Sequence, residues 1–363
     1  MNDRQKYLSH HNKFEMKKKK AFVLTVFFFF AGCEKILLGP EEENTPQNNF
    51  EILWKTFDEN YALFPVKKVN WDSLHAVYGS RISSSTTDAQ LWDITAELIS
   101  TLNDGHVTLF DKGYSRWANS SEINARIAND FSLSLVRNNF LANVTVAGGG
   151  YITYGKVRNK NIGYIYVATF QGSNSGSGID WAYDIDKAVT DLSGCDALII
   201  DLRNNGGGLK VTVGIIVSAF IDREITFFYQ QEKTGPGHYD FGKRVPLTAA
   251  PRSGAPRFTK KMALLTNRFS GSGSEHFAQV FQYLPYATQI GDTTFGCFGD
   301  VLNVAQLPNG WTFRYPCRLT TTPEGTSPEG IGIIPDVLVE NTKEGIEAGR
   351  DYVLENAIQY LSP

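Results

Sequence analysis

The sequence is poor in cysteine, lacks an excess of positive charge and contains no apolar run long enough to span a membrane. Its four cysteines in 363 residues are too few for disulfides to be the main support of the fold. With 35 Lys and Arg against 38 Asp and Glu, the formal net charge is −3, which argues against a nucleic-acid-binding protein. The sequence contains neither a common nucleotide-binding glycine pattern nor a cluster of metal-binding residue types. We therefore expect no cofactor and no nucleic-acid partner.

The N-terminal segment is typical of a secretory signal. Four lysines precede the apolar stretch Ala21–Gly32, whose 12 residues are too few to cross a hydrocarbon core of about 30 Å as a helix. The following "FAGC" resembles a bacterial lipobox, which implies cleavage before Cys33 and lipidation of its thiol. An ordinary signal peptide beside an accidental cysteine is the alternative. We predict a signal at 1–33, a flexible tether at 34–49 and an exported, membrane-anchored lipoprotein of the bacterial cell envelope.

The three remaining cysteines are Cys195, Cys297 and Cys317, an odd number. Cys297 and Cys317 flank a predicted hairpin around "LPNG" at 307–310. A disulfide between these two residues is one interpretation, and the sequence leaves it open.

The rest of the chain divides by its hydrophobic pattern. Residues 50–115 show apolar residues at three- and four-residue steps and predict a small N-terminal helical subdomain. Residues 116–160 look β-like and irregular. From 161 to 363, continuous apolar strands such as "IGYIYVATF", "DALIIDLR" and "KMALLTN" alternate with helical segments. This alternation predicts an α/β core whose sheet is covered on both faces.

Three consecutive glycines form the first candidate for chemistry. Gly206, Gly207 and Gly208 follow the strand "DALIID" and the segment "LRNN". Glycines placed there allow backbone N–H groups to approach a ligand closely, as an oxyanion requires. A glycine-rich turn without chemistry is the alternative.

Three serines at alternate positions form the second candidate. Ser270, Ser272 and Ser274 precede an amphipathic helix, and Gly271 and Gly273 separate them. The free N–H groups at the start of a helix stabilise developing negative charge, which favours a nucleophile at Ser272. Helix capping is the alternative, since serine is also a preferred N-cap residue.

A serine nucleophile needs a base within hydrogen-bond reach. His106, in "LNDGHVTLF", lies between the helical unit and the next strand and is the candidate base. A lone histidine is more often structural than catalytic, so the interpretation of His106 as a base depends on the serine and glycine segments.

Taken in order, these stretches resemble the C-terminal processing peptidases, or tail-specific proteases, and especially their tricorn-core-like branch. The resemblance is carried over about residues 50 to 340 by "LNDGHV", "NIGYIYVATF", "ALIIDLRNNGGG", "LLTNRFSGSGSE", "IGDTTFG" and "PEGIGIIPD". It implies a crotonase-like α/β fold and a serine peptidase. Processing proteases often carry a PDZ domain before the core, and residues 107–160 are too few for one.

The resemblance also implies roles for single residues. Ser272 is similar to the family's nucleophile, and the amides of Gly273 and Gly207 to its oxyanion hole, with Gly208 as a secondary candidate. Many members use a lysine where this chain has Cys297, and a thiol is no straightforward substitute for that base. The tricorn-like branch instead uses a histidine and an acid.

His106 and Glu329 stand at the positions of that histidine and acid. Gly105 replaces the serine that precedes the histidine in the tricorn-like branch, so Asp104 is a second candidate for orienting the imidazole. Lys210, after the glycines, is either a ligand for a substrate carboxylate or an ordinary solvated lysine.

The sequence thus predicts a Ser–His(–Glu) peptidase acting on peptides or proteins, with a membrane reached through the lipid on Cys33. A catalytically inactive relative that binds a peptide or an apolar ligand is the alternative. Acyl-CoA chemistry on the same fold is disfavoured, because an exported protein would lack a CoA supply and the serine cluster would have no role.

Overall fold

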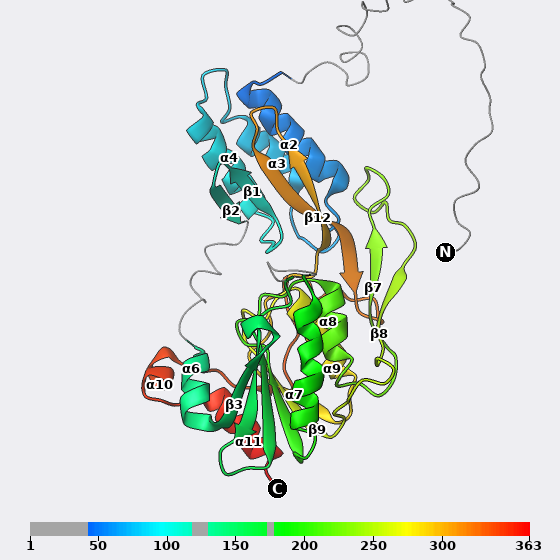
Figure 1. Cartoon of the computed structure of the whole chain (residues 1–363). Helices are drawn as coiled ribbons and strands as arrows, with labels where there is room; N and C mark the ends of the chain where they lie inside the picture. The colour runs from blue at the N-terminus through cyan, green and yellow to red at the C-terminus, as the bar shows by residue number, and fades with distance from the viewer. Residues whose placement is uncertain (1–42, 118–129, 173–177) are drawn as a thin grey trace, which may run out of the picture. The chain divides into compact units, whose positions relative to one another are not determined.

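The computed structural model describes residues 43–117, 130–172 and 178–363 (Figure 1). The predicted signal at 1–33 and Cys33 lie outside the described residues. In the part of the chain that is described, no helix is long and apolar enough to cross a membrane. Residues 44–363 form one compact unit.

Three helices near the N-terminus bury the apolar stripe that the sequence predicts. They are α2 (Pro46–Asn60), α3 (Trp71–Gly79) and α4 (Asp88–Ser100). α2 starts at Thr45, whose side chain accepts the N–H of Asn48, and Pro46 occupies the first helical turn where no N–H is needed. Phe50 and Leu53 from this helix pack with residues of the neighbouring sheet, including Phe313.

That neighbouring sheet is antiparallel and has six strands. It contains β1 (Thr108–Asp111), β2 (Tyr114–Trp117), β7 (Ile225–Glu232), β8 (Val245–Ala249), β11 (Asp300–Gln306) and β12 (Thr312–Thr321). The order is β2-β1-β12-β7-β8, and β11 also pairs with β12. The β11–β12 pairing encloses residues 307–311, in agreement with the predicted hairpin.

The second sheet has seven strands and is mostly parallel. It contains β3 (Leu141–Ala147), β4 (Ile152–Val157), β5 (Ile162–Val167), β6 (Ala197–Asp201), β9 (Lys261–Thr266), β10 (Ala287–Gly291) and β13 (Val337–Leu338). The order is β13-β10-β9-β6-β5-β4-β3, parallel from β13 to β5 and antiparallel beyond. Because β3 and β4 belong to this sheet, the predicted division at residue 160 falls inside one sheet.

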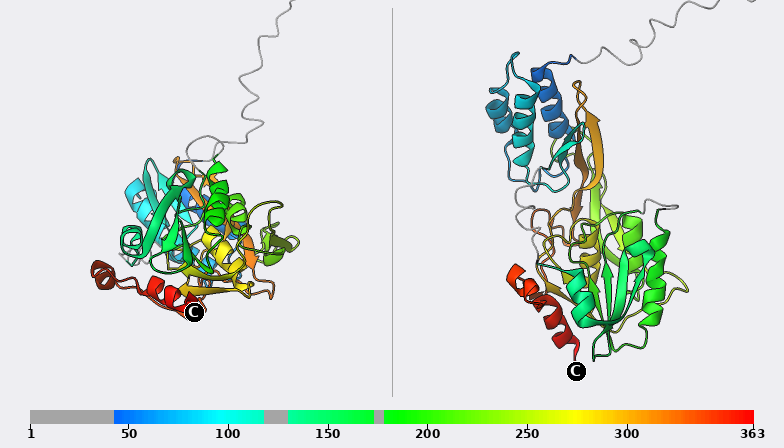
Figure 2. Two further views of the ribbon diagram at one scale, coloured as in Figure 1. Left: turned by 60° about the horizontal axis from the view of Figure 1, so that its bottom comes forward. Right: turned by 60° about the vertical axis from the view of Figure 1, so that its left-hand side comes forward.

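The remaining elements are helices and short helical turns, most of which cover the second sheet. They are α6 (Leu133–Leu135), η1 (Val136–Phe140), η2 (Gly148–Gly150), η3 (Asp180–Asp184), α7 (Ile185–Asp191), α8 (Lys210–Val217), α9 (Gly273–Gln282), α10 (Lys343–Glu347) and α11 (Tyr352–Leu361). Side chains of α7, α8 and α9 belong to one hydrophobic cluster, and those of α11 belong to another. In the right-hand view of Figure 2, the red C-terminal helix and the green helices lie on opposite sides of the green strands.

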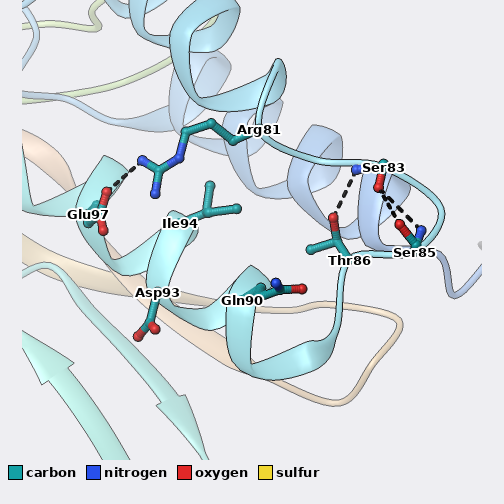
Figure 3. A pocket seen from close by; sticks show the side chains of 8 residues that line it. All are labelled: Arg81, Ser83, Ser85, Thr86, Gln90, Asp93, Ile94 and Glu97. Atoms are coloured by element: carbon teal, nitrogen blue, oxygen red, sulfur yellow. Dashed lines mark hydrogen bonds and ion pairs between the residues drawn. The ribbon is translucent and has the colours of Figure 1, made fainter.

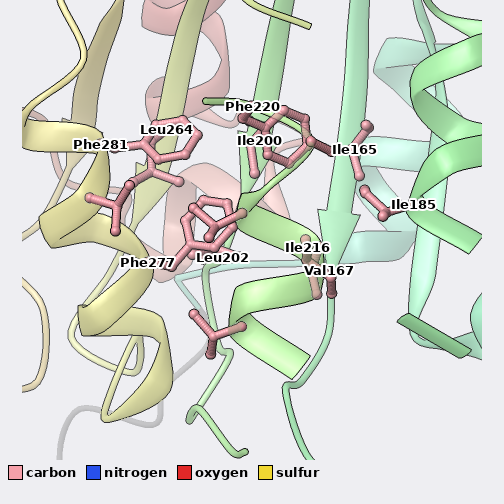
Figure 4. Close-up of a cluster of buried hydrophobic side chains, with 14 of the residues drawn as sticks. Ile165, Val167, Ile185, Ile200, Leu202, Ile216, Phe220, Leu264, Phe277 and Phe281 are labelled. Atoms are coloured by element: carbon pink, nitrogen blue, oxygen red, sulfur yellow. The ribbon is translucent and has the colours of Figure 1, made fainter. Parts of the chain in front are cut away.

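Strand β6 shows how one apolar run serves both clusters. Leu198 and Ile200 pack toward α7, α8 and α9 (Figure 4 labels Ile200), whereas Ala197 and Ile199 pack toward α11. Alternate side chains of a strand point to opposite faces, so a sheet covered on both sides needs apolar residues at every position. The predicted α/β class is confirmed.

The cysteines in the described residues are free and buried, namely Cys195, Cys297 and Cys317. The pairing of Cys297 with Cys317 that the sequence left open is therefore not formed. The register of the hairpin explains this, because Asp300 lies opposite Arg318 and Cys297 falls before the paired part of β11.

Candidate active site

The parallel strands β6 and β9 lie side by side and bring two candidate segments together. The glycine segment follows the carboxyl end of β6, and the serine segment follows the carboxyl end of β9. In open parallel sheets, ligands bind at this edge, where the strands end and the loops begin. Backbone hydrogen bonds join the two loops, since the Gly271 N–H donates to the carbonyl of Asn205 at 3.1 Å.

The three serines have different environments. The hydroxyl of Ser270 donates to the carbonyl of Leu202 at 2.9 Å, and that of Ser274 donates to the carbonyl of Asn205 at 2.7 Å. Both serines are fully buried. Ser272 is partly exposed, and its Oγ lies 3.2 Å from Nε2 of His106. Ser270 and Ser274 thus stabilise the loop through backbone hydrogen bonds, whereas Ser272 lies beside His106.

Ser272 also has an unusual backbone conformation. Its φ is 52° and its ψ is −113°, outside the regions that a residue with a Cβ normally adopts. Such strain persists only where surrounding contacts enforce it, and it gathers at functional sites. A strained serine between a strand and a helix is also how other hydrolases expose a nucleophile.

His106 is placed by the turn that precedes β1. Oδ1 of Asp104 accepts its backbone N–H at 2.7 Å, and Oδ2 of Asp104 accepts the hydroxyl proton of Tyr61 at 2.7 Å. Asp104 therefore fixes the backbone of His106. The ring Nδ1 is buried and has no hydrogen-bond partner in the described part of the chain.

The surroundings of His106 favour its neutral form. Burial lowers the pKa of the imidazole, the charge of Asp104 acts in the opposite direction, and the charge of Arg314 lowers the pKa further. A neutral imidazole with Nε2 facing a serine hydroxyl is the arrangement that general-base catalysis requires.

Glu329, predicted to orient His106, has other partners. Its Oε1 accepts a hydrogen bond from Nζ of Lys67 at 2.8 Å, and its Oε2 accepts the N–H groups of Phe298 at 2.7 Å and Gly299 at 3.2 Å. The lysine and the two amides engage both oxygens, which leaves Nδ1 of His106 without this partner. Burial and the charge of Asp104 raise the pKa of Glu329 to about 7, and Lys67 opposes that rise.

The predicted oxyanion donors also differ in their availability. The N–H of Gly207 donates to Oδ1 of Asn205 at 2.9 Å and is therefore engaged within its own loop. Across residues 43–117, 130–172 and 178–363, the N–H groups of Gly208 and Gly273 have no hydrogen-bond partner. A Cβ built on Gly273 would lie 3.1 Å from the Gly208 nitrogen, so these free donors lie close together.

Glu275 is a residue whose importance the sequence did not reveal. Its carboxylate accepts the N–H groups of Ser272 at 2.8 Å, Gly296 at 2.6 Å and Cys297 at 3.0 Å, and the hydroxyl proton of Thr294 at 2.7 Å. It is fully buried. A glutamate three residues after a helix-starting serine is the usual signal for such a backbone bond.

Cys297 and Lys210, both singled out in the sequence, have structural surroundings. Burial raises the pKa of the Cys297 thiol well above its ordinary value, and the charges of Glu275 and Glu329 add to the rise. Lys210 forms an ion pair with Asp300 and donates to Oε1 of Gln230 at 2.9 Å. In this structure its ammonium therefore binds a carboxylate of its own chain.

A polar hollow of about 460 Å³ lies elsewhere, on the N-terminal helical part (Figure 3). Arg81 and Glu97 form an exposed ion pair on its wall, and the hydroxyls of Ser83 and Ser85 bond to one another. None of these side chains faces a base as Ser272 does. In the described residues, no group of three or more His, Cys, Asp or Glu side chains could hold a metal ion.

Comparison with known proteins assigns the chain to a family. Residues 161–339 match the model of Peptidase family S41, and residues 42–100 match the model of the Tricorn protease C1 domain. A solved structure of a candidate peptidase from Parabacteroides merdae is 30% identical, with a TM-score of 0.79, and the match covers 88% of this chain and 98% of that one. The chain belongs to peptidase family S41, and the predicted resemblance is confirmed.

Two curated relatives match the core. The carboxy-terminal-processing protease of Bartonella bacilliformis is 32% identical over 178 residues, covering 47% of this chain and 38% of that protein. The tricorn protease of Thermoplasma volcanium is 26% identical over 204 residues, covering 56% of this chain and 18% of that protein. The chain thus spans well under two thirds of the length of either relative.

Proposed function

We propose that this chain is a serine peptidase in which Ser272 is the nucleophile and His106 the general base. The observation that carries the proposal is the 3.2 Å approach of Ser272 Oγ to His106 Nε2, two residues that lie 166 positions apart in the sequence. Membership of peptidase family S41 supports the same reaction class. A protein that only binds a ligand would have no use for this contact or for the strained backbone of Ser272.

The mechanism follows from the positions of these groups. Ser272 Oγ attacks the carbonyl carbon of a peptide bond while Nε2 of His106 takes its proton. The imidazolium then gives that proton to the leaving amine, and an acyl-enzyme remains on Ser272. Water, deprotonated by His106, hydrolyses the acyl-enzyme and restores the serine.

The oxyanion of the tetrahedral intermediate needs two fixed donors. We assign them to the N–H groups of Gly273 and Gly208, in place of the Gly273 and Gly207 pair that the resemblance implied, because the Gly207 N–H is engaged with Asn205. Loss of one such donor typically costs about 2.7–4 kcal/mol of transition-state stabilisation. Glu329 takes no part in the proton transfer, since its oxygens bind Lys67, Phe298 and Gly299.

The substrates are peptides or proteins. Hydrolysis of a diverse peptide mixture by the segment 44–363, followed by mass spectrometry, tests this directly. Wild type and the exposed control Ser83→Ala should produce new peptide termini, and Ser272→Ala should produce none while remaining folded by circular dichroism. A folded wild type that cleaves no peptide, or a Ser272→Ala variant that cleaves as fast as wild type, contradicts the proposal.

We also propose that the chain is exported and anchored to a membrane of the bacterial cell envelope by a lipid on Cys33. The lysines, the apolar stretch Ala21–Gly32 and the "FAGC" sequence support this address. A fatty-acid analogue fed to a bacterial host that expresses the full chain should label wild type and not Cys33→Ala. Equal labelling of the two proteins, or labelling of neither, contradicts the anchor.

A further inference from the structure

Lys67 is a largely buried cation beside the turn that presents His106. Its side chain is 9% exposed, and that of its partner Glu329 is 1% exposed. Nζ of Lys67 donates to Glu329 Oε1 at 2.8 Å and to the carbonyl of Asn103 at 3.0 Å. One ammonium thus ties Glu329 to the turn that leads into His106.

Glu329 carries this link to the other side of the site. Its second oxygen accepts the N–H groups of Phe298 and Gly299. The preceding residue, Cys297, donates its own N–H to the carboxylate of Glu275.

Glu275 in turn accepts the backbone N–H of Ser272. A series of hydrogen bonds therefore runs from the His106 turn through Lys67, Glu329, the 297–299 segment and Glu275 to the nucleophile. Lys67 is the member of this series that comes from the segment after α2, far from the others in the sequence.

The positive charge of Lys67 also compensates buried negative charge near the site. Asp104 and Glu329 are both buried, and the charge of Asp104 disfavours ionisation of Glu329. Removal of a cation from a buried cluster leaves a carboxylate uncompensated, which is strongly unfavourable. The positive charge of Lys67 also acts on His106, whose pKa is lowered by burial, Arg314 and Lys67 and raised by Asp104 and Asp300.

We infer that Lys67 is a positioning residue of the active site: through Glu329 it holds the His106 turn and the Ser272 turn in the geometry of their contact. The inference rests on the proposed function, since the geometry it explains is that of the Ser272–His106 pair.

The test is the rate at which a fluorophosphonate labels Ser272 as a function of pH, in wild type, Lys67→Met and the matched control Lys68→Met. Lys68 is the neighbouring lysine and is exposed. Lys67→Met should lower the plateau rate by about 10- to 100-fold, because a misplacement of about 1 Å can cost about 100-fold. The variant should also shift the rising part of the curve of labelling rate against pH to higher pH, because it lacks a cation that lowers the pKa of His106. Lys68→Met should match wild type in both respects.

A double variant separates positioning from a loss of folding. Lys67→Met/Glu329→Gln lacks both the cation and its uncompensated partner, so it should fold even where Lys67→Met does not, and the rising part of its curve should remain displaced to higher pH. Wild-type rates and a wild-type pH curve in both Lys67 variants overturn the inference while leaving the peptidase proposal intact. A folded wild type that is not labelled at Ser272 overturns the peptidase proposal, and the inference falls with it.

Discussion

Glu275 accepts the backbone N–H of Ser272 at 2.8 Å, so the helix that follows the nucleophile also enforces its strained conformation. The same carboxylate accepts donors from Thr294, Gly296 and Cys297. One buried side chain therefore fixes the nucleophile against the segment that follows β10.

The substitution Glu275→Ala tests whether these hydrogen bonds hold the nucleophile in place. The substitution leaves buried donors without an acceptor, at about 1–3 kcal/mol for each that water cannot reach, so we expect a loss of about 3 kcal/mol or more in the free energy of unfolding. We also expect slower labelling of Ser272, because its backbone can relax. Urea denaturation and the labelling rate measure the two effects. A variant with wild-type stability and labelling rate would contradict this role of Glu275.

Gly207 should tolerate no side chain. A Cβ there would lie 2.5 Å from the Gly273 nitrogen and 2.9 Å from Ser272 Cβ, and the φ of Gly207 is +92°. Gly207→Ala should lower kcat by about 100-fold or more by displacing an oxyanion donor. Gly206→Ala is the matched control, because a Cβ on Gly206 would meet nothing within 4 Å. Similar activity in the two variants would argue against the placement of the oxyanion hole.

Arg203 should matter for stability far more than for chemistry. The guanidinium is 1% exposed and binds Asp201 and Asp351, which joins the end of β6 to the start of α11. Arg203→Met leaves both carboxylates buried and unpaired, so we expect a loss of about 3–5 kcal/mol in the free energy of unfolding.

The contrasting variant is Arg81→Met. Arg81 pairs with Glu97 on the exposed wall of the hollow in Figure 3, and exposed ion pairs contribute little. Urea denaturation of both variants should show a large effect for Arg203 alone. Equal effects would mean that the buried pairs do not hold β6 to α11.

His276 should make the fold sensitive to acid. It lies one turn after Ser272 on α9, and burial lowers its pKa to about 4. The unfolded chain binds the proton with a pKa of about 6.5, so stability is fully present above that pH and is lost as pH falls toward 4. Over this interval the loss is about 3 kcal/mol, at 1.36 kcal/mol for each pKa unit.

His276→Gln removes that loss. The difference in unfolding free energy between neutral and mildly acidic solution should be smaller in the variant than in wild type by most of this amount. An unchanged pH dependence would show that His276 is not buried as a neutral base in the folded protein.

The sequence predicted the parts of the fold that depend on local pattern. The apolar run at 197–200 predicts a strand covered on both faces, because both sets of alternating side chains are then buried. Three serines before a helix and one histidine before a strand pointed to Ser272 and His106, and the structure brings those two together. Residues 116–160 were predicted to be β-like, but the pairing of β3 and β4 with the main sheet depends on contacts between separate strands, which no local pattern contains.

The hydrogen-bond partners of the residues in the site could not be predicted from local pattern. Glu329 binds Lys67, which comes from a turn 262 positions away, and no local pattern specifies such a pairing. Gly207 binds Asn205 two residues before it, so its N–H turns away from the position that the resemblance assigned to it. Both outcomes depend on which donors and acceptors the folded chain brings within 3 Å, and a motif does not contain that information.

The measurement that tests the central claim most directly is covalent labelling of the folded segment 44–363 with a fluorophosphonate, with the labelled residue identified by peptide mass spectrometry. The account predicts that wild type carries one label, on Ser272, and that Ser272→Ala and His106→Ala, both folded, carry none on the measured time scale. A label on another residue, or labelling of His106→Ala as fast as wild type, would contradict a histidine-activated nucleophile at Ser272.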